Sequence, residues 1–443
     1  MAAPFVRVSL ALAIVTSLTF AASPRRGRGR PASRPAASQP VVPPNLGDDL
    51  TVWPNRVSYR NSDPWIWQNH ERIRKMRPRV LVLNFANDAE MSQIRTHAEG
   101  LIRALAESTR YHGYKDPSAP AFLEYEVVKY VDMRDRPVPP ERRNRNSAFF
   151  PAKVDGPADF GCDYGAFYTD AFARFYGFAD PGNPRRFLNL HDLINAGFVH
   201  ELWFYAVHVY EEGWPAHEVI ELKQYYDENC RPIPGRYGPA GNGHDDSFPW
   251  SGRSFRMCFF NPHRGIGCSM ENFGHGLEAY ANHNAIAYYT PYFREFAELD
   301  LDRKYGLPFR SLYQIPYEAP GDVTYPTPTT MKVRYQGKEY TIDPYVAVGG
   351  NVHWPPGATH HYDLDSRYTV RSTIENWRQR NGPDGKDLAA DFSREKFMRY
   401  RDVAPDCMGA WMVFWRQNMP GLDNKCLDDS GRPMKNWWVF LFY

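Results

Sequence analysis

Acidic and histidine side chains recur at helical spacing in residues 271–278. Glu271, His275 and Glu278 stand at positions i, i+4 and i+7 of a segment that follows an apolar run and a glycine-containing turn. On an α-helix these positions fall within about 60° of arc, so the three side chains would share one face. Two carboxylates beside an imidazole can bind a metal ion or transfer a proton. The alternative interpretation is a solvated helix face.

The glycines beside His275 bear on this choice. Ser269 is a suitable N-cap, and an acid such as Glu271 in the first turn interacts favourably with the helix dipole without any function. Gly274 and Gly276 are not explained in this way, because two glycines inside a helix cost about 2 kcal/mol together. We therefore expect either close packing of another backbone or space for a ligand at His275.

Other polar residues extend the candidate site. Glu201 lies inside an apolar, strand-like run, where an unpaired carboxylate is costly, so it should face a polar cavity or a wet sheet face. His244 and Asp245 lie in a loop rich in Gly and Asn. There they would either form a turn or bind calcium or zinc. The predicted catalytic residues are Glu201, Glu271, His275 and Glu278, and the predicted ligands of a divalent metal are His275, Glu278, His244 and Asp245.

The turn before the helix and a later histidine-rich stretch give a second set of candidates. Gly265 and Gly267 lie between a predicted strand and helix, where α/β proteins bind ligands and where free N–H groups attract anions. The sequence there is not a phosphate-loop fingerprint. His353 lies in a stretch that would form a second polar wall or would pack as an ordinary loop. We predict that Gly265, Gly267 and His353 bind substrate.

The order of elements predicts an α/β fold with a mostly parallel, Rossmann-like sheet flanked by helices. The expected strands are 79–85, 125–131, 199–207 and 255–260, and the expected helices are 94–105, 188–196 and 269–289. Strands that alternate with helices are typical of such sheets. We expect a long irregular insert over 208–252, a hairpin over 331–342, and an aromatic-rich C-terminal α+β extension.

The N-terminus predicts export. Residues 1–21 combine a basic start, a short apolar core and small residues, as a secretory signal peptide does. Their apolar run is too short to span a membrane. Residues 22–46 read as an Arg/Pro-rich disordered linker, residues 47–300 as the α/β domain, and residues 301–443 as an extension packed on it. The protein is therefore expected to be secreted.

Charge and cysteine content narrow the possible partners. The chain has a formal net charge of +2, and removing the six arginines that precede residue 47 leaves −4 on the rest. A nucleic-acid partner for the folded body is thus poorly supported. Six cysteines in an exported chain favour disulfides, and sequence proximity suggests Cys258–Cys268, Cys407–Cys426 and Cys162–Cys230. The same residues as buried free thiols are the alternative.

Several of these segments together resemble a loosely defined set of exported bacterial proteins with no known activity. That set has a Glu-x-Trp strand, an Arg-Gly-x-Gly turn, a Phe-Gly-His-x-x-Glu helix and a His-x-Pro-Pro stretch that ends in Tyr-Asp. The matching positions are Glu201, Arg264, Gly265, Gly267, His275, Glu278, His353 and Asp363, whereas His200 stands where an acid is expected. The resemblance supports the residues chosen above and adds Arg264 to those predicted to bind substrate.

Taken together, the sequence predicts a secreted hydrolase acting on an extracellular glycan or related polymer. A His/Glu cluster, with or without a divalent metal ion, would provide the chemistry. Neither a His-Glu-x-x-His zinc motif nor a Gly-x-Ser-x-Gly elbow occurs in the sequence, so metallopeptidases and serine hydrolases of the standard types are disfavoured. The alternatives are a non-enzymatic protein that binds cell-surface carbohydrate and a structural envelope protein.

Overall fold

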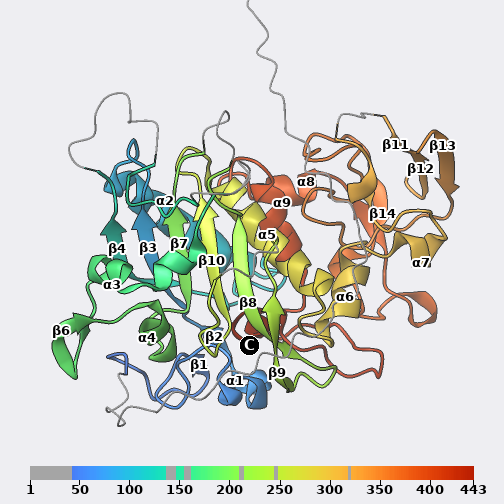
Figure 1. Ribbon diagram of the computed structural model, residues 1–443. Helices are drawn as coiled ribbons and strands as arrows, with labels where there is room; N and C mark the ends of the chain where they lie inside the picture. The colour runs from blue at the N-terminus through green and yellow to red at the C-terminus, as the bar shows by residue number, and fades with distance from the viewer. Residues whose placement is uncertain (1–41, 136–145, 154–160, 209–213, 244–247, 318–320) are drawn as a thin grey trace, which may run out of the picture. The chain divides into compact units, whose positions relative to one another are not determined.

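A six-stranded mixed sheet forms the centre of the fold (Figure 1). Its spatial order is β4 (Glu126–Asp132), β3 (Arg79–Asn84), β7 (Glu201–Tyr205), β10 (Phe255–Phe260), β8 (Val219–Tyr226) and β9 (Pro232–Pro239). The first four strands run parallel to one another, and β8 and β9 are antiparallel to their neighbours. The expected α/β class with a mostly parallel sheet is therefore confirmed.

Helices cover both faces of this sheet because its strands are apolar on both sides. Val80 and Val82 of β3 belong to a core shared with α2 (Met91–Ser108), α5 (Ile266–Asn282) and α9 (Gly409–Gln417). Leu81 and Leu83 point to the opposite face and pack in a second core with α3 (Asp170–Tyr176) and α4 (Leu190–Asn195). The alternation of side chains along each strand thus separates the two cores.

The structure is a computed structural model that describes residues 42–135, 146–153, 161–208, 214–243, 248–317 and 321–443. The predicted signal peptide and most of the predicted linker lie outside these ranges. The further helices are α1 (Pro64–Gln68), α6 (Tyr289–Phe296), α7 (Leu301–Tyr305) and α8 (Glu395–Met398). The further strands are β1 (Val52–Trp53), β2 (Lys75–Met76), β5 (Ala179–Asp180), β6 (Asn183–Phe187), β11 (Val323–Thr327), β12 (Thr330–Tyr335), β13 (Lys338–Ile342), β14 (Val370–Ser372) and β15 (Ala390–Phe392).

The segment expected to be an irregular insert, 208–252, instead contains β8 and β9. Its prolines and glycines suggested a loop, but Pro232 and Pro239 lie on β9, which is an edge strand of the sheet. Edge strands tolerate proline because one side of the backbone needs no ladder hydrogen bond. The antiparallel start of β8 therefore lies beside the carboxyl end of β10.

The C-terminal part of the chain supports the helices of the main sheet. All of α9 is buried, and it packs against α2 and α5. The last turn, Trp437–Phe442, is buried in the same core. The expected hairpin is formed by β12 and β13, with Gln336 and Gly337 at positive φ in its turn. Within the described ranges, no helix combines the length and the apolar character needed to cross a membrane.

His200 is a structural residue at the start of β7. Its Nδ1 accepts a hydrogen bond from the backbone N–H of Arg79 (2.8 Å), and its Nε2 lies 2.9 Å from the carbonyl oxygen of Tyr59. The first contact requires a lone pair on Nδ1, so the ring is neutral with its proton on Nε2. Burial lowers the pKa of His200 to about 3.

This neutral imidazole makes stability depend on pH. We expect the free energy of unfolding to fall by about 1.4 kcal/mol per pH unit as the pH drops from the ordinary histidine range toward 3, because only the unfolded chain takes up the proton. His200→Asn keeps an acceptor for Arg79 but cannot titrate. Urea denaturation at several acidic pH values should show a shallower pH slope for the variant, and equal slopes would contradict a neutral His200.

Candidate metal centre

Helix α5 presents Glu271, His275 and Glu278 on one face. Nε2 of His275 lies 3.8 Å from Oε1 of Glu271, and Nδ1 of His275 lies 2.9 Å from Oε2 of Glu278. The two ring nitrogens therefore face different carboxylates. The expectation that the three side chains share a face agrees with this geometry, but their roles differ from those predicted.

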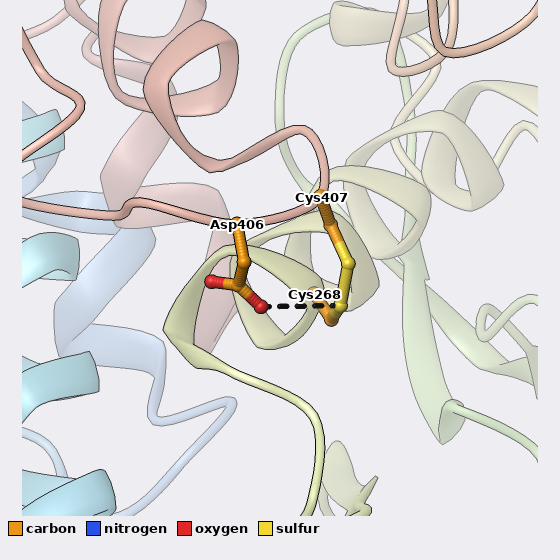
Figure 2. Close-up of side chains that lie close together, drawn as sticks. All are labelled: Cys268, Asp406 and Cys407. Atoms are coloured by element: carbon orange, nitrogen blue, oxygen red, sulfur yellow. Dashed lines mark hydrogen bonds between the residues drawn. A yellow bond between two sulfur atoms is a disulfide. The ribbon is translucent and has the colours of Figure 1, made fainter.

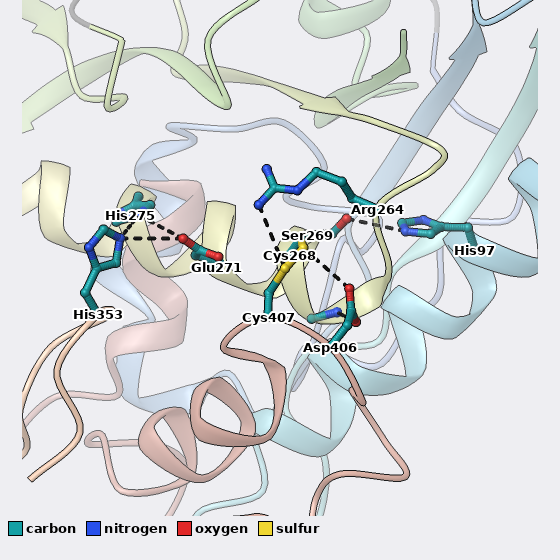
Figure 3. The surroundings of a disulfide bond; sticks show 10 residues. His97, Arg264, Cys268, Ser269, Glu271, His275, His353, Asp406 and Cys407 are labelled. Atoms are coloured by element: carbon teal, nitrogen blue, oxygen red, sulfur yellow. Dashed lines mark hydrogen bonds and ion pairs between the residues drawn. A yellow bond between two sulfur atoms is a disulfide. The ribbon is translucent and has the colours of Figure 1, made fainter. Parts of the chain in front are cut away.

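A third element completes the cluster. The loop after β13 brings His353 to the same face of α5, so that its Nε2 lies 3.2 Å from Nε2 of His275 and 3.5 Å from Oε1 of Glu271 (Figure 3). Glu271, His275 and His353 thus place three potential ligand atoms around one point. Ligands of a tetrahedral zinc ion at about 2.0–2.1 Å lie about 3.3–3.4 Å apart. The three observed separations fall close to that spacing.

Glu278 orients His275 and is not one of the three converging ligands. Its carboxylate accepts hydrogen bonds from the hydroxyl of Tyr313 (2.8 Å) and from the backbone N–H of Val352 (3.2 Å), in addition to its contact with Nδ1 of His275. A carboxylate that holds Nδ1–H of a histidine leaves the Nε2 lone pair for a metal ion. Glu278 was predicted as a direct metal ligand, but it lies outside the converging group, and that role stays a prediction.

A chain of hydrogen bonds orients His353 in the same way. Nε2 of His361 lies 2.9 Å from the carbonyl oxygen of Ile315 and must donate to it, so Nδ1 of His361 is the acceptor for Nδ1–H of His353, 3.0 Å away. The hydroxyl of Tyr317 lies 3.3 Å from the same nitrogen of His353. Nε2 of His353 then carries a lone pair directed at His275.

The charges of the cluster favour a bound cation. Burial alone would raise the pKa of Glu271, but the imidazoles of His275 and His353 hold it well below its usual range. Burial opposes protonation of His275, yet the carboxylates of Glu271 and Glu278 raise its pKa well above the ordinary value. Within the described ranges, Oε2 of Glu271 is buried and accepts no hydrogen bond of ordinary geometry. Either a proton on His275 or a metal ion can neutralise this excess of negative charge, and metal binding would release that proton.

Glu218 lies beside this cluster. It directly precedes β8, and Asn242 Nδ2 donates to its carboxylate (3.0 Å). Burial raises its pKa, His275 lowers it, and Glu271 raises it, so the three groups act on one another. The pair His217-Glu218 is a candidate in the sequence, but Glu218 was not among the predicted catalytic or metal-binding residues.

Four further residues lie near the centre, namely Tyr313, Tyr317, His361 and Tyr362. His361 and Tyr362 belong, with His353, to the stretches that were expected to form a second polar wall, whereas Tyr313 and Tyr317 were missed. The rings of Tyr317 and His361 stack at 3.8 Å, and the ring of Tyr362 lies 4.1 Å from that of His353. Tyr317 and Tyr362 are exposed to about 40%, and the His275 side chain keeps 17% exposure, so the centre is partly open to solvent.

Gly274 is explained by the approach of the His353 loop. A Cβ at this position would lie 2.8 Å from Cγ2 of Val352 and 2.9 Å from Sδ of Met412, whereas a Cβ at Gly276 would meet only Val219, at 3.8 Å. The first glycine permits the close packing that places His353 opposite His275. The second has room for a side chain.

This contrast provides a matched pair of variants. We expect Gly276→Ala to stabilise the fold by up to about 1 kcal/mol through helix propensity. Gly274→Ala should destabilise it by about 1–3 kcal/mol through overpacking and weaken metal binding, because Val352 must move together with His353. Urea denaturation and zinc titration measure both effects. Equal behaviour of the two alanine variants would contradict the close approach.

Gly265 and Gly267 serve the start of α5. The N–H of Gly267 donates to Oδ1 of Asp406 (2.7 Å), and a Cβ at either glycine would collide with Asp406. The carboxylate thus occupies the helix N-terminus, where an anionic ligand was expected. The N–H of Gly267 is therefore already used within the protein, and substrate binding by the two glycines stays a prediction.

A disulfide joins this turn to the segment that precedes α9. Cys268 and Cys407 are bonded, 139 positions apart in the chain, with Oδ2 of Asp406 3.4 Å from Sγ of Cys268 (Figure 2). The pairings expected from sequence proximity are wrong, since Cys230, Cys258 and Cys426 are buried and form no disulfide. Because the two sulfur atoms are bonded to each other, this group offers no thiolate to a metal.

Glu201 belongs to a different cluster. It is the first residue of β7, and its carboxylate binds Tyr125 (3.0 Å), the indole of Trp203 (3.0 Å) and Arg256 (3.0 Å). Arg256 also pairs with Glu221 (2.9 Å). Glu201 was predicted to act together with His275 and Glu278, but the start of a parallel strand lies at the sheet edge opposite its carboxyl end, and its carboxylate is paired with Arg256 instead. His244 and Asp245, the other predicted ligands, lie outside the described residues.

A hollow of about 760 Å³ lies elsewhere in the described part of the chain, lined by residues of α6, α7 and the segment after β14. Two of the acids at its wall are bound within the protein: Glu295 by Trp377 and Arg378, and Asp429 by Arg378. Potential metal ligands converge instead at Glu271, His275 and His353.

Comparison with models of known protein families, with curated proteins and with solved structures finds no match for this chain.

Proposed function

We propose that Glu271, His275 and His353 bind a divalent metal ion, with zinc preferred, and that the protein is a secreted metal-assisted hydrolase. The observation that carries this proposal is the convergence of Nε2 of His275, Nε2 of His353 and Oε1 of Glu271 at separations of 3.2–3.8 Å. Two imidazoles and one carboxylate are a ligand set of catalytic zinc sites, which keep the fourth position for water.

The surrounding residues support a hydrolytic role. Zinc lowers the pKa of a bound water toward neutrality. Glu218 directly precedes β8, accepts a hydrogen bond from Asn242 and acts electrostatically on His275 and Glu271, so it would be the general base of such a reaction. Glu278 and His361 fix the ring orientations of the two histidine ligands. Glu218, Glu278 and His361 would thereby each have a distinct role at the centre.

The proposed substrate is an extracellular glycan or related polymer. The exposed rings of Tyr317 and Tyr362 flank the approach to His353 and suit the apolar face of a sugar. The Cys268–Cys407 disulfide supports export to an oxidising compartment. We also propose a Rossmann-like arrangement, because the parallel strands stand in the order β4-β3-β7-β10, in which the second strand precedes the first as in doubly wound sheets.

Turnover by zinc-loaded protein tests this function. We expect hydrolysis of one or more polysaccharides in a product screen, with loss of activity on chelation and recovery with added zinc. Glu218→Gln should reduce turnover by about 10²- to 10⁴-fold without loss of bound zinc. The matched control is Glu339→Gln on the exposed β13, where Glu339 pairs with Lys332.

Two results would contradict parts of this proposal. Polysaccharide binding without any product, in the presence of zinc, would favour the non-enzymatic carbohydrate-binding alternative. Undiminished turnover by Glu218→Gln would remove this residue from the mechanism.

A further inference from the structure

Arg264 is a half-buried arginine beside the metal centre, and its guanidinium has no carboxylate partner in the part of the chain that the structure describes. It lies in the turn between β10 and α5. Figure 3 shows its side chain extending from this turn toward the part of α5 that carries Cys268 and Glu271. Among the described residues, no carboxylate oxygen lies within 4.0 Å of it, and its only short polar contact is with Sγ of Cys407, at 3.8 Å.

An aromatic ring packs against this guanidinium. Its carbon lies 5.5 Å from the ring centroid of Trp214, and the ring of His208 is stacked on that of Trp214 at 4.5 Å with an interplanar angle of 7°. A guanidinium over an aromatic ring can keep its N–H donors available for other acceptors. The side chain is thus packed against Trp214, while the described residues use few of its donors.

The position of Arg264 relates it to the proposed hydrolytic centre. Its charge acts on the carboxylate of Glu218, which in turn interacts with His275 and Glu271. If Arg264 served only to neutralise Glu218, a direct ion pair would be the expected geometry, and none is formed. A planar guanidinium with free donors beside an acidic metal centre is suited to bidentate binding of an oxyanion.

We propose that Arg264 binds an oxyanion group of the substrate, a carboxylate, sulfate or phosphate, while the bond to be hydrolysed lies at the metal centre. The substrate class is then an acidic glycan rather than a neutral one. This substrate class rests on the proposed function, because the metal centre supplies the second contact. The anion site itself consists of Arg264 held by Trp214 and does not require the metal.

Inorganic phosphate, sulfate and acetate are suitable probes. Their affinities can be measured by calorimetry with zinc-loaded and zinc-free protein, together with the zinc content of each sample. We expect Arg264→Met to weaken binding of the preferred anion by about 10- to 100-fold, as for loss of a charged hydrogen bond, with an intermediate loss for Arg264→Lys, which keeps the charge but not the fork. The preferred anion identifies the acidic group.

Arg95→Met is the matched control, since Arg95 also stacks on an aromatic ring, that of Tyr130 (4.1 Å), but lies on the exposed side of α2. The anion affinities of the Arg95→Met variant should equal those of the unmodified protein. Equal affinities of Arg264→Met and the unmodified protein, or no binding of any probe, would overturn the anion site. Loss of zinc binding with intact Arg264-dependent anion binding would instead contradict only the proposed function.

Discussion

His353→Ala and His275→Ala proteins are expected to bind zinc far more weakly than the unmodified chain, while Glu278→Gln should lose only about 10- to 100-fold in affinity. The difference arises because His275 and His353 each direct Nε2 at the shared point, whereas Glu278 acts through Nδ1 of His275. Zinc dissociation constants from competition with a chromophoric chelator provide the measurement.

A neighbouring histidine serves as the control for this series. His360 adjoins His361 in the chain, but its ring contacts Thr359 and Asp363 and not His353. His360→Ala should therefore bind zinc as the unmodified protein does. If Glu278→Gln were as damaging as His353→Ala, Glu278 would be a direct ligand and the described geometry of the centre would be wrong.

Replacing Arg256 is expected to have the largest effect on stability. Its guanidinium is buried between Glu201 (3.0 Å) and Glu221 (2.9 Å), and removing it leaves two buried carboxylates, of which Glu221 keeps an ion pair with Lys223. Breaking a buried ion pair on one side costs about 3–5 kcal/mol. Arg256→Met should lower the free energy of unfolding by about that amount in urea denaturation.

Two comparisons define the cause of this loss. Arg334→Met, at an exposed position of β12, should change the free energy of unfolding by less than about 0.5 kcal/mol. Adding Glu201→Gln to Arg256→Met should recover part of the stability, since Glu201 then carries no unpaired charge and Glu221 keeps Lys223 as its partner. A loss below about 1 kcal/mol for Arg256→Met would indicate that water reaches this cluster, and a functional role for Glu201 would return to consideration.

Local patterns in the sequence predicted the elements well. The four parallel strands, α2 and α5 follow from continuous apolar runs and helical periodicity, and the spacing of Glu271, His275 and Glu278 placed them on one face. These features depend on residues close together in the chain. The same logic failed for β8 and β9, because the prolines of an edge strand resemble those of a loop.

The site itself depends on contacts that no local pattern encodes. His353 reaches His275 from 78 positions away, and Asp406 reaches Gly267 from 139 positions away. Neither approach can be read from the spacing of residues in the sequence. The sequence analysis therefore predicted that Gly267 binds substrate and that Glu278 binds the metal. It also paired Cys268 with the wrong cysteine. Glu201 was misplaced because a buried carboxylate predicts a polar partner but not which one, and the partner is Arg256 of the neighbouring strand.

Anomalous X-ray diffraction at the zinc absorption edge, from crystals of zinc-loaded protein, tests the metal centre most directly. We expect one strong peak per chain within about 2.0–2.2 Å of Nε2 of His275, Nε2 of His353 and a carboxylate oxygen of Glu271. The absence of a peak at this point under saturating zinc, or a peak held by other residues, would contradict the assignment of these three side chains as a metal site.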